Sequence, residues 1–449
     1  MRNYVIIGGG AAGWAAAESI RRRDTTGAVW ILTEDPYGYY SRPGLAYYLS
    51  GEATEEQLYP FDSRFWDDLR VRWHVDRVIS VSPLQRLVKF RNGKSLQYDR
   101  LLIATGSTAM MPDVPGIALD GVVKLDNMDD VRSILKRARR RETVVVVGGG
   151  ITALELAEGL AEKGMRVHYF LRGERYWSGV LDPTESRIVE DRLIRSGIEI
   201  HYQTNLVEVE GKNGRVNAVL AQSSGKPVRI ACRMVGIAIG IRPCTGLAQS
   251  AGLGVKRGVL ATTMLQTSNQ DIYTAGDVAE ILDPVSGESL LDSLWNPAIS
   301  MGQVAGANMA GDCQHYLKQI PYNVTRLAGL VTTIIGQIAS QSGAAAKDRD
   351  LSGGIMRGDS ETWRIMPEAV VAQTIHNTDR LRLYIYRNTI AGAILMGEQH
   401  LSRPLQHLIR SKTDIGSIRD RLLAPQADLN GIIQEFWQKQ TQRNAVKIT

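Results

Sequence analysis

A glycine-rich turn near the start of the chain constrains the fold more than any other feature of the sequence. Residues 4–7 form a short apolar run that predicts a buried strand, and residues 14–20 have the composition of a helix. Between them, Gly8, Gly10 and Gly13 follow the spacing GxGxxG. In such a turn the first glycine permits a tight bend, the second lets the backbone approach a pyrophosphate, and the third lets the helix pack on the strand. The order strand, turn, helix therefore predicts a dinucleotide-binding unit.

A second strand and an acidic residue complete this unit. Residues 28–32 predict the strand, and Glu34 follows it, 21 residues after Gly13. A carboxylate at this distance can accept hydrogen bonds from the ribose hydroxyls of an adenine dinucleotide. The pyrophosphate would lie at the N-terminus of the helix, where backbone N–H groups and the helix dipole favour an anion. The start of the chain therefore predicts a Rossmann-like domain.

The same arrangement occurs a second time. Residues 142–147 predict a valine-rich strand, residues 154–163 predict a helix, and Gly148, Gly150 and Ala153 take the three positions of the turn between them. Alanine replaces the third glycine, which the packing role tolerates. Two such units in one chain predict two dinucleotides, usually a bound flavin and a diffusing nicotinamide cofactor.

Length and composition agree with a globular protein of several domains. The 449 residues are 44% hydrophobic and 22% charged, and about 150 residues per domain gives roughly three domains. No run approaches about 18 apolar residues, so we expect no transmembrane segment. The sequence shows no signal-peptide pattern and has only three cysteines, Cys232, Cys244 and Cys313. These features predict a reducing, cytoplasmic location.

The spacing of cysteine and histidine argues against several kinds of site. No cysteines form a CxxC pair and the seven histidines form no HExxH motif. We therefore expect no disulfide scaffold, iron–sulfur cluster or metal site. The net charge is +6, but no recognition motif accompanies it, so nucleic-acid binding is not expected. The basic runs at 21–23 and 136–141 suit solvated helix ends, or the attraction of an acidic protein partner.

Five motifs, in their order along the chain, resemble those of the FAD-dependent pyridine nucleotide-disulphide oxidoreductases. They are GGGAAG at 8–13, LLIATGS at 101–107, GGGITALE at 148–155, GIRP at 240–243 and IYTAGD at 272–277. The resemblance implies an α/β fold with two Rossmann-like dinucleotide-binding domains, one inserted in the other, followed by a small C-terminal α+β domain. Residues 1–115 and 241–323 would form the FAD-binding domain, 116–240 the NAD(P)-binding domain, and 324–449 the C-terminal domain.

The resemblance also implies which residues hold the cofactors, FAD and either NADH or NADPH. On the flavin side, Gly8, Gly10, Ala12 and Gly13 would hold the pyrophosphate, Glu34 the ribose, and Gly276 and Asp277 the ribityl chain, with Thr105 and Gly106 at the domain crossing and Ala298 at a helix N-terminus facing the flavin ring. On the nicotinamide side, Gly148, Gly150 and Ala153 would cradle the dinucleotide, Glu155 would lie near its nicotinamide end, and Gly240 would begin the GIRP motif. No residue is expected to act as a covalent catalyst.

Residues 40–45 resemble the RPxL segment of rubredoxin and ferredoxin reductases and of the flavin domain of NADH-dependent nitrite reductases. Arg42 and Pro43 would then lie beside the flavin. The family's disulfide reductases place a cysteine pair in this region, whereas this chain has no cysteine near it. A redox-active disulfide and sulfide:quinone chemistry are therefore not expected. The lysine that usually follows is replaced by Ala46 and Tyr47, so Tyr47 is expected to stack or hydrogen-bond at the flavin.

The choice between NADH and NADPH stays open in the sequence. Aligning Gly27 with Gly164 puts Leu171 at the position of Glu34. Arg172 and Arg175 follow and would suit the 2′-phosphate of NADPH. Glu174 could instead bind a ribose.

The C-terminal region predicts a hairpin over 380–397. Residues 380–386 alternate with period two, Asn388 and Thr389 predict a turn, and residues 390–396 predict the returning strand. Helices are predicted at 402–411, about 415–423 and 429–439, with Ser402 and Asp428 as N-caps. In related reductases this domain supplies a dimer surface or one wall of the flavin site, so a homodimer is among the expectations.

The activity that these features imply is transfer of a hydride from NAD(P)H to flavin, then of electrons to an acceptor. The acceptor is expected to be a small redox protein such as rubredoxin or ferredoxin, because a flavin accepts two electrons and can release them singly. Two alternatives remain, a quinone or small-oxidant reductase and a flavoprotein module of a larger assembly.

Overall fold

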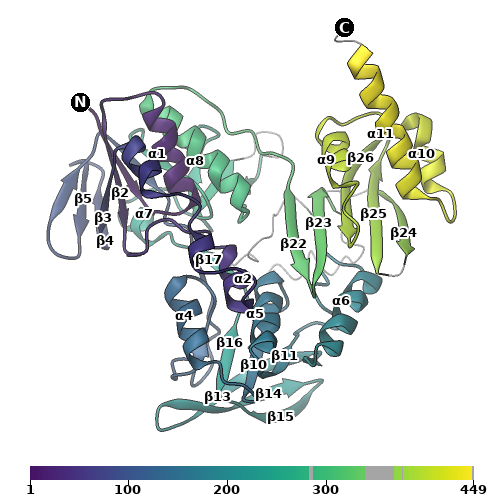
Figure 1. Cartoon of the computed structure of the whole chain (residues 1–449). Helices are drawn as coiled ribbons and strands as arrows, with labels where there is room; N and C mark the ends of the chain where they lie inside the picture. The colour runs from purple at the N-terminus through teal and green to yellow at the C-terminus, as the bar shows by residue number, and fades with distance from the viewer. Residues whose placement is uncertain (283–286, 339–368, 377, 447–449) are drawn as a thin grey trace. The chain divides into compact units, whose positions relative to one another are not determined.

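The computed structural model describes residues 1–282, 287–338, 369–376 and 378–446, which form two compact units (Figure 1). The first unit contains Met1–Arg172 and Gly197–Lys318. The second contains Gly173–Ser196 and the described residues that follow Lys318. In the described part of the chain, no helix has the length and apolar character needed to cross a membrane.

Two five-stranded parallel sheets form the framework of the first unit, and four strands of each follow the same order, which confirms the predicted pair of Rossmann-like folds. The fifth strand differs, because β19 is the last strand of its sheet in the sequence and β9 is the first of its own. In each, the strand before the glycine turn lies at the centre, and the strand after the first helix lies beside it. The last strand of the first sheet, β19, comes after the whole second sheet in the sequence, so one fold is inserted in the other. The first sheet orders β19 (Ile272–Thr274), β7 (Arg100–Ile103), β1 (Asn3–Ile7), β2 (Ala28–Thr33) and β3 (Val71–Val75). The second orders β12 (Glu199–His201), β11 (Arg166–Phe170), β10 (Thr143–Val147), β16 (Met234–Ile237) and β9 (Val122–Val123).

The central strand β1 is apolar along its length because both of its faces are buried, as is usual in a parallel sheet. Tyr4 and Ile6 join one hydrophobic cluster, with residues of α1. Val5 and Ile7 join another cluster on the opposite face. Strand β10, with its four valines, takes the same place in the second sheet.

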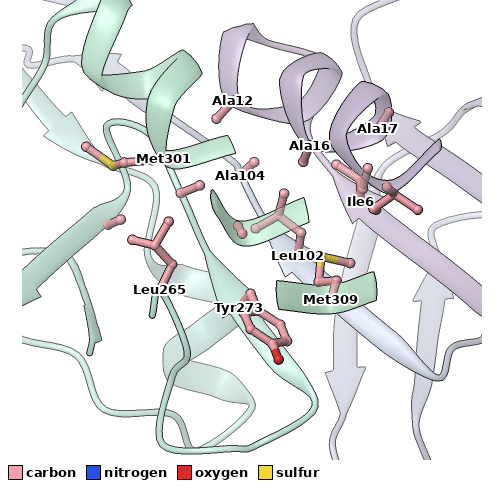
Figure 2. Packing of buried hydrophobic residues seen from close by; sticks show 14 of the residues in the cluster. Ile6, Ala12, Ala16, Ala17, Leu102, Ala104, Leu265, Tyr273, Met301 and Met309 are labelled. Atoms are coloured by element: carbon pink, nitrogen blue, oxygen red, sulfur yellow. The ribbon is translucent and has the colours of Figure 1, made fainter. Parts of the chain in front are cut away.

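Helices α1 (Ala11–Arg21) and α8 (Trp295–Ala310) pack with their backbones in contact. Figure 2 shows side chains of both helices, among them Ala12 and Met301, in one hydrophobic cluster. A Cβ on Gly302 would lie 2.2 Å from the carbonyl oxygen of Ala12, and one on Gly306 would lie 2.4 Å from that of Ala16. Larger side chains would force the helices apart. The small residues of α8 therefore serve close packing against the helix that follows the first glycine turn.

The remaining elements of the first unit cover and connect the two sheets. The helices are α2 (Gly44–Ser50), η1 (Glu56–Leu58), α3 (Ser63–Leu69), α4 (Met128–Arg137), α5 (Ile151–Glu162) and α7 (Gly246–Ser250). Antiparallel sheets comprise β4 (Val78–Ser82), β5 (Leu87–Phe90) and β6 (Ser95–Gln97), and β13 (Thr204–Lys212), β14 (Arg215–Ser223) and β15 (Lys226–Ala231). Strands β18 (Val259–Ala261), β20 (Ala279–Leu282) and β21 (Ser289–Leu290) form a further sheet, and β8 (Ser107–Ala109) pairs with β17 (Ile241–Pro243).

The second unit is an antiparallel five-stranded sheet packed with helices, as expected for a C-terminal α+β domain. The predicted hairpin is confirmed as β25 and β26, joined at Arg387 and Asn388. The order is β22 (Tyr322–Leu327), β23 (Leu330–Gly336), β26 (Thr389–Met396), β25 (Asp379–Tyr386) and β24 (Val370–His376). The helices are α6 (Pro183–Arg195), α9 (Ser402–Arg410), α10 (Gly416–Leu423) and α11 (Leu429–Val446).

Of the two predicted caps in this unit, one is confirmed and one is wrong. The carboxylate of Asp428 accepts a hydrogen bond from the backbone N–H of Gly431 at 3.0 Å, as an N-cap does. Ser402 is the first residue inside α9, and Leu401 precedes it as the N-cap. The Ser402 hydroxyl lies instead 3.5 Å from the hydroxyl of Thr333.

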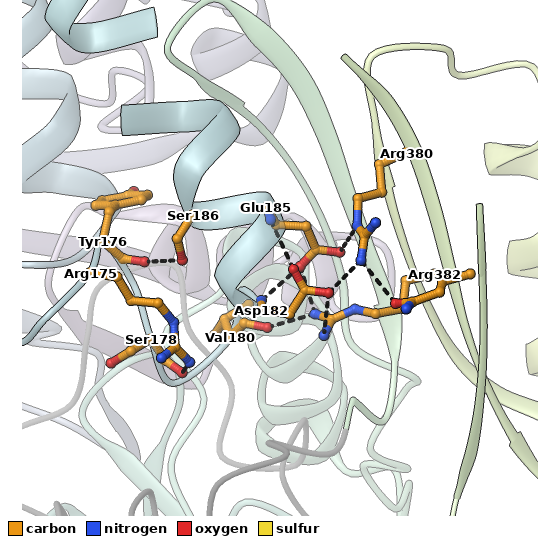
Figure 3. A network of polar contacts seen from close by, with 10 residues as sticks. Arg175, Tyr176, Ser178, Val180, Asp182, Glu185, Ser186, Arg380 and Arg382 are labelled. Atoms are coloured by element: carbon orange, nitrogen blue, oxygen red, sulfur yellow. Dashed lines mark hydrogen bonds and ion pairs between the residues drawn. The ribbon is translucent and has the colours of Figure 1, made fainter. Parts of the chain in front are cut away.

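A buried network of four charges joins α6 to the C-terminal sheet within the second unit (Figure 3). Arg382 donates to Glu185 at 2.8 Å, and Arg380 lies 2.5 Å from Asp182 and 3.2 Å from Glu185. The side chains of both arginines are at most 4% exposed. Asp182 and Glu185 also form the capping box of α6, so the same two carboxylates begin the helix and bind the strand.

The pKa values of the two carboxyl groups in this network are shifted in opposite directions. Burial raises the pKa of Glu185, and the nearby Arg382 and Arg380 offset only part of that effect. Burial also acts to raise the pKa of Asp182, but the N–H group of Glu185 and the two arginines outweigh it and lower that pKa. The ionised form of Asp182 therefore stabilises the unit.

Replacing Arg382 with leucine is expected to destabilise the second unit, because Glu185 would keep its burial and lose its closest cation. Breaking one side of a buried ion pair costs about 3–5 kcal/mol. Scanning calorimetry should show a lower melting temperature for the transition of this unit. As a control, R421L removes an exposed pair with Glu435, for which we expect a loss of about 1 kcal/mol or less. Equal effects of the two substitutions would contradict this account.

Candidate functional site

The first glycine turn forms a cradle in which protein backbone lies against protein backbone. Gly8 has a φ of +116°, and a Cβ there would lie 2.1 Å from the carbonyl oxygen of Ala104. A Cβ on Gly13 would lie 2.1 Å from the oxygen of Gly8. At Gly10, by contrast, no described residue beyond its chain neighbours has a heavy atom within 4 Å of such a Cβ. This open side faces a helix start that no described side chain caps, which fits a pyrophosphate.

The second turn repeats this geometry. Gly148 has a φ of +146°, and its Cβ would lie 2.1 Å from the oxygen of Ala238 and 2.9 Å from the Cβ of Ala153. Gly150 is the extended N-cap of α5, and no described side chain caps that helix either. Both turns therefore have the shape that a dinucleotide pyrophosphate requires.

Strand register shows which residue of the second fold corresponds to Glu34. Gly8 donates to the carbonyl of Leu32 at 2.8 Å, and Gly148 donates to that of Phe170 at 3.2 Å. Glu34 lies two residues after Leu32, so its counterpart is Arg172. The alignment that gave this place to Leu171 is therefore wrong, because β11 starts two residues after Gly164, whereas β2 starts one residue after Gly27.

The chain leaves the first fold through β8 and returns to it through β17, and these two short strands form the crossing between the folds. Strands β8 and β17 pair antiparallel, the hydroxyl of Thr105 donates to the carbonyl of Cys244 at 2.8 Å, and the N–H of Cys244 donates to Gly106 at 2.9 Å. Gly106 and Gly240 have φ values of +65° and +131°. The LLIATGS and GIRP motifs thus meet, and the predicted residues Thr105, Gly106 and Gly240 lie at that meeting point.

Three further predicted residues converge beside α1. Gly276, with a φ of +80°, would place a Cβ 3.2 Å from the Cβ of Ala12 and 3.8 Å from that of Ala298. Asp277, the next residue, accepts a hydrogen bond from the hydroxyl of Ser107 at 2.7 Å. Residues from four distant parts of the sequence are therefore brought together next to the first cradle.

Arg42 lies among acidic groups of this region. Arg42 is exposed, but protein atoms crowd its surroundings. Loss of hydration there acts to lower the pKa of Arg42, and Tyr40, Asp126 and Asp277 outweigh this effect and raise that pKa. Arg42 therefore stays cationic beside the carboxylate of Asp277. Pro43 is the N-cap of α2, so this loop leads directly into the helix that contains Tyr47.

Helix α2 packs against α5, the helix of the second cradle. Leu49 fills the space beside Gly159, where a Cβ would lie 2.7 Å from the leucine side chain. Tyr47 and Glu155 are half-buried residues of these two neighbouring helices. A pocket at the start of α5 is lined by Ala109, Leu125, Ile151, Thr152, Ile237, Ala238, Gly240 and Ile241.

The remaining predicted residues lie at the periphery. Glu34 is exposed, and its carboxylate lies 3.7 Å from the guanidinium of Arg77. Arg172 is exposed at the end of the first unit. Arg175 belongs to the second unit and donates to the carbonyl of Ser178 at 3.3 Å.

Two groups near Arg42, Asp126 and Cys244, were not predicted from the sequence. Asp126 accepts hydrogen bonds from the hydroxyl of Thr108 at 3.0 Å and from the N–H of Ala109 at 3.2 Å. Burial raises the pKa of the Cys244 thiol, Asp126 raises it further, and Arg42 opposes them. Asn127 and Asp130 form the capping box of α4 directly after Asp126, so the sequence did contain a signal that Asp126 lies just before a helix.

Comparisons with known proteins agree with this geometry. The family described as pyridine nucleotide-disulphide oxidoreductase matches residues 2–307. The chain is 31% identical over 332 residues to the NAD(P)H sulfur oxidoreductase (CoA-dependent) of Pyrococcus abyssi, covering 72% of this chain and 73% of that protein. It is 28% identical over 310 residues to the rubredoxin-NAD(+) reductase of Pseudomonas putida, covering 68% and 80%.

Solved structures show the same fold at lower sequence identity. The ferredoxin reductase for the CYP199A2 system of Rhodopseudomonas palustris matches with a TM-score of 0.82 at 22% identity, over 97% of this chain and 99% of that one. NADH:rubredoxin oxidoreductase from Clostridium acetobutylicum matches with a TM-score of 0.69 at 21% identity, over 97% and 99%.

Replacing Gly10 with alanine is expected to leave the fold intact and to weaken FAD binding. The backbone at Gly10 is extended, with a φ of −80°, so the added methyl meets the pyrophosphate rather than the protein. We expect FAD affinity to fall at least tenfold, which corresponds to about 1.4 kcal/mol. Titration of the apoprotein with FAD measures this, and circular dichroism reports on the fold. The control is G246A, which adds a methyl in open space at the start of α7. Unchanged FAD affinity in G10A would contradict the assignment of this cradle.

Proposed function

This chain belongs to the pyridine nucleotide-disulphide oxidoreductase family and is an FAD-dependent oxidoreductase that uses NAD(P)H, and from this premise we propose a more specific activity. It takes a hydride from NADPH and passes electrons through flavin to a small redox protein of the rubredoxin or ferredoxin type. No disulfide takes part. The observation that carries this proposal is the pair of dinucleotide cradles within one unit, beside a loop that holds Arg42 and Pro43 in place of cysteines.

When bound, FAD supplies an acceptor for two electrons that can be released one at a time. The protein contributes position and charge. Gly10 and Gly150 would let the two pyrophosphates approach their helices. Asp277, which accepts a hydrogen bond from Ser107, would accept another from the ribityl chain. Arg42 places a fixed positive charge in the same region, and such a charge stabilises negative charge that develops nearby.

The absence of a disulfide step rests on the positions of the cysteines. Cys232 is buried, Cys244 is half-buried and Cys313 is exposed, and all three are free thiols. Neither Arg42 nor its neighbours in residues 36–50 is a cysteine. No cysteine pair beside this loop could therefore accept electrons from the flavin, which favours their direct transfer from the flavin to an external acceptor. Free thiols also support the cytoplasmic location that we include in the proposal.

A preference for NADPH is supported by the position of Arg172. A carboxylate at this point of a dinucleotide fold accepts hydrogen bonds from the ribose, whereas an arginine accommodates the 2′-phosphate. Strand register puts Arg172 where the first fold has Glu34. The two folds therefore differ at the residue that distinguishes a free ribose from a phosphorylated one.

A homodimer completes the proposal. Val324 of β22 and Val331 of β23 are each exposed by at least a third. They lie on the same face of neighbouring strands, because Val331 pairs with Arg326, two residues after Val324. These two side chains give the edge of the sheet an apolar surface that a second copy could cover.

Anaerobic stopped-flow mixing with NADPH and with NADH tests the reductase function. Rapid bleaching of the oxidised flavin absorbance by NADPH, and slower bleaching by NADH, is the expected result. Reoxidation is then measured with rubredoxin or ferredoxin, and in parallel with a quinone, polysulfide and oxygen. Faster reoxidation by one of the small molecules would overturn the proposed acceptor. Flavin that neither nucleotide bleaches would overturn the reductase mechanism itself.

Substituting Arg172 with glutamate tests the nucleotide preference. We expect kcat/KM for NADPH to fall about 10- to 100-fold, because hydrogen bonds to charged groups contribute about 1.5–3 kcal/mol. The kcat/KM for NADH should stay the same or rise. The control, K226A, removes an exposed cation from β15 and should change neither value. A parallel loss with both nucleotides in R172E would show that Arg172 does not recognise the phosphate.

A further inference from the structure

Three potential metal ligands lie together at the edge of the second parallel sheet, away from both glycine turns in the sequence. His168 lies in β11, and Glu199 and His201 lie in the edge strand β12. Residues two apart in a strand point to the same face, so Glu199 and His201 share a face. The register pairs His168 with Glu199 and Phe170 with His201. The two strands therefore present two imidazoles and one carboxylate side by side.

The distances within this cluster match those between ligands of one metal ion. His168 Nδ1 lies 3.0 Å from His201 Nε2, and the carboxylate oxygens of Glu199 lie 3.4 Å from the first nitrogen and 3.2 Å from the second. Ligand atoms about 2.0–2.1 Å from a tetrahedral zinc ion lie about 3.3 Å apart. An ion at the centre of the cluster would thus need little movement of the side chains.

Burial differs among the three groups in a way that suits metal binding. The side chains of His168 and His201 are 22% and 18% exposed, whereas that of Glu199 is 63% exposed. The ring of Phe170 packs edge-on against His201, with 5.3 Å between the ring centroids. The two imidazoles are therefore held in position, and the carboxylate side is open to water. His168 Nδ1 and His201 Nε2 can each offer a lone pair to an ion when the other nitrogen of the same ring carries the proton.

We propose that His168, Glu199 and His201 bind a divalent transition-metal ion of the zinc class, with water in the remaining position. Two nitrogen ligands and one carboxylate suit zinc, and they disfavour magnesium and calcium, which prefer oxygen ligands. The ion would fasten β12 to β11. Backbone hydrogen bonds already join these strands at this point, since Leu171 donates to the carbonyl of His201 at 2.9 Å.

Isothermal titration of zinc chloride into the full-length, FAD-loaded protein, stripped beforehand with a chelator, tests this site. One zinc ion per chain is expected to bind, and magnesium chloride should give no saturable binding. H168A and H201A should each weaken zinc binding at least about tenfold, since even partners outside the first ligand shell contribute 10–100-fold. E199Q removes the charge of one exposed ligand without creating a cavity, and it should also weaken zinc binding. It keeps the proposal testable if H168A or H201A does not fold.

Two control variants separate this site from other zinc ligands of the chain. H376A removes an exposed histidine of the second unit, and C313S removes an exposed thiol. Both should bind zinc as the wild type does. Absence of one-to-one binding, equal binding of magnesium, or wild-type zinc affinity in H168A, H201A and E199Q would each overturn the proposal. Flavin bleaching by NADPH is measured separately, so these outcomes are distinguishable from failure of the reductase function.

Discussion

Close approach of one backbone to another at the first glycine turn is the constraint on which the rest of the first unit depends. Gly8 lies against the carbonyl of Ala104, and Gly302 of α8 lies against that of Ala12. Neither position has space for a Cβ. These contacts fix helix α1 between a strand and a second helix, and they leave its N-terminus, at Gly10, open on the side where a pyrophosphate would bind. The same close packing therefore builds the core and shapes the cradle.

The two parallel sheets share the order of four strands, and in the proposed function they bind two different dinucleotides. Their glycine turns have the same backbone contacts, with Ala104 in the first and Ala238 in the second. They differ at the residue that follows the second strand, which is Glu34 in one fold and Arg172 in the other. At such a position a carboxylate accepts hydrogen bonds from ribose hydroxyls, whereas a guanidinium suits a phosphate. In the proposed function the two glycine turns would bind the pyrophosphates that both dinucleotides share, and the residues at the strand ends would distinguish the two nucleotides.

The sequence predicted those parts of the structure that depend on local patterns. Both glycine turns, the strands before them and the hairpin 380–397 follow from residue spacing alone. The alignment of Glu34 failed because the connection between helix and strand differs in length in the two folds, which only the register with β1 and β10 reveals. Asp126 and Cys244 were missed for a related reason, since their place near Arg42 depends on the pairing of β8 with β17.

Groups that come together across strands are the hardest to predict, and the charges of this chain illustrate why. Arg380 and Arg382 belong to an alternating pattern that suggests one exposed face, yet both are buried because Asp182 and Glu185 of α6 neutralise them. His168 and His201 are 33 residues apart and form no motif, yet the parallel register of β11 and β12 brings their nitrogens within hydrogen-bonding distance. In each case a partner from a distant segment determines whether the residue is buried or exposed and which groups it contacts. Topology, which local spacing does not contain, therefore decides which polar residues form a site and which remain solvated.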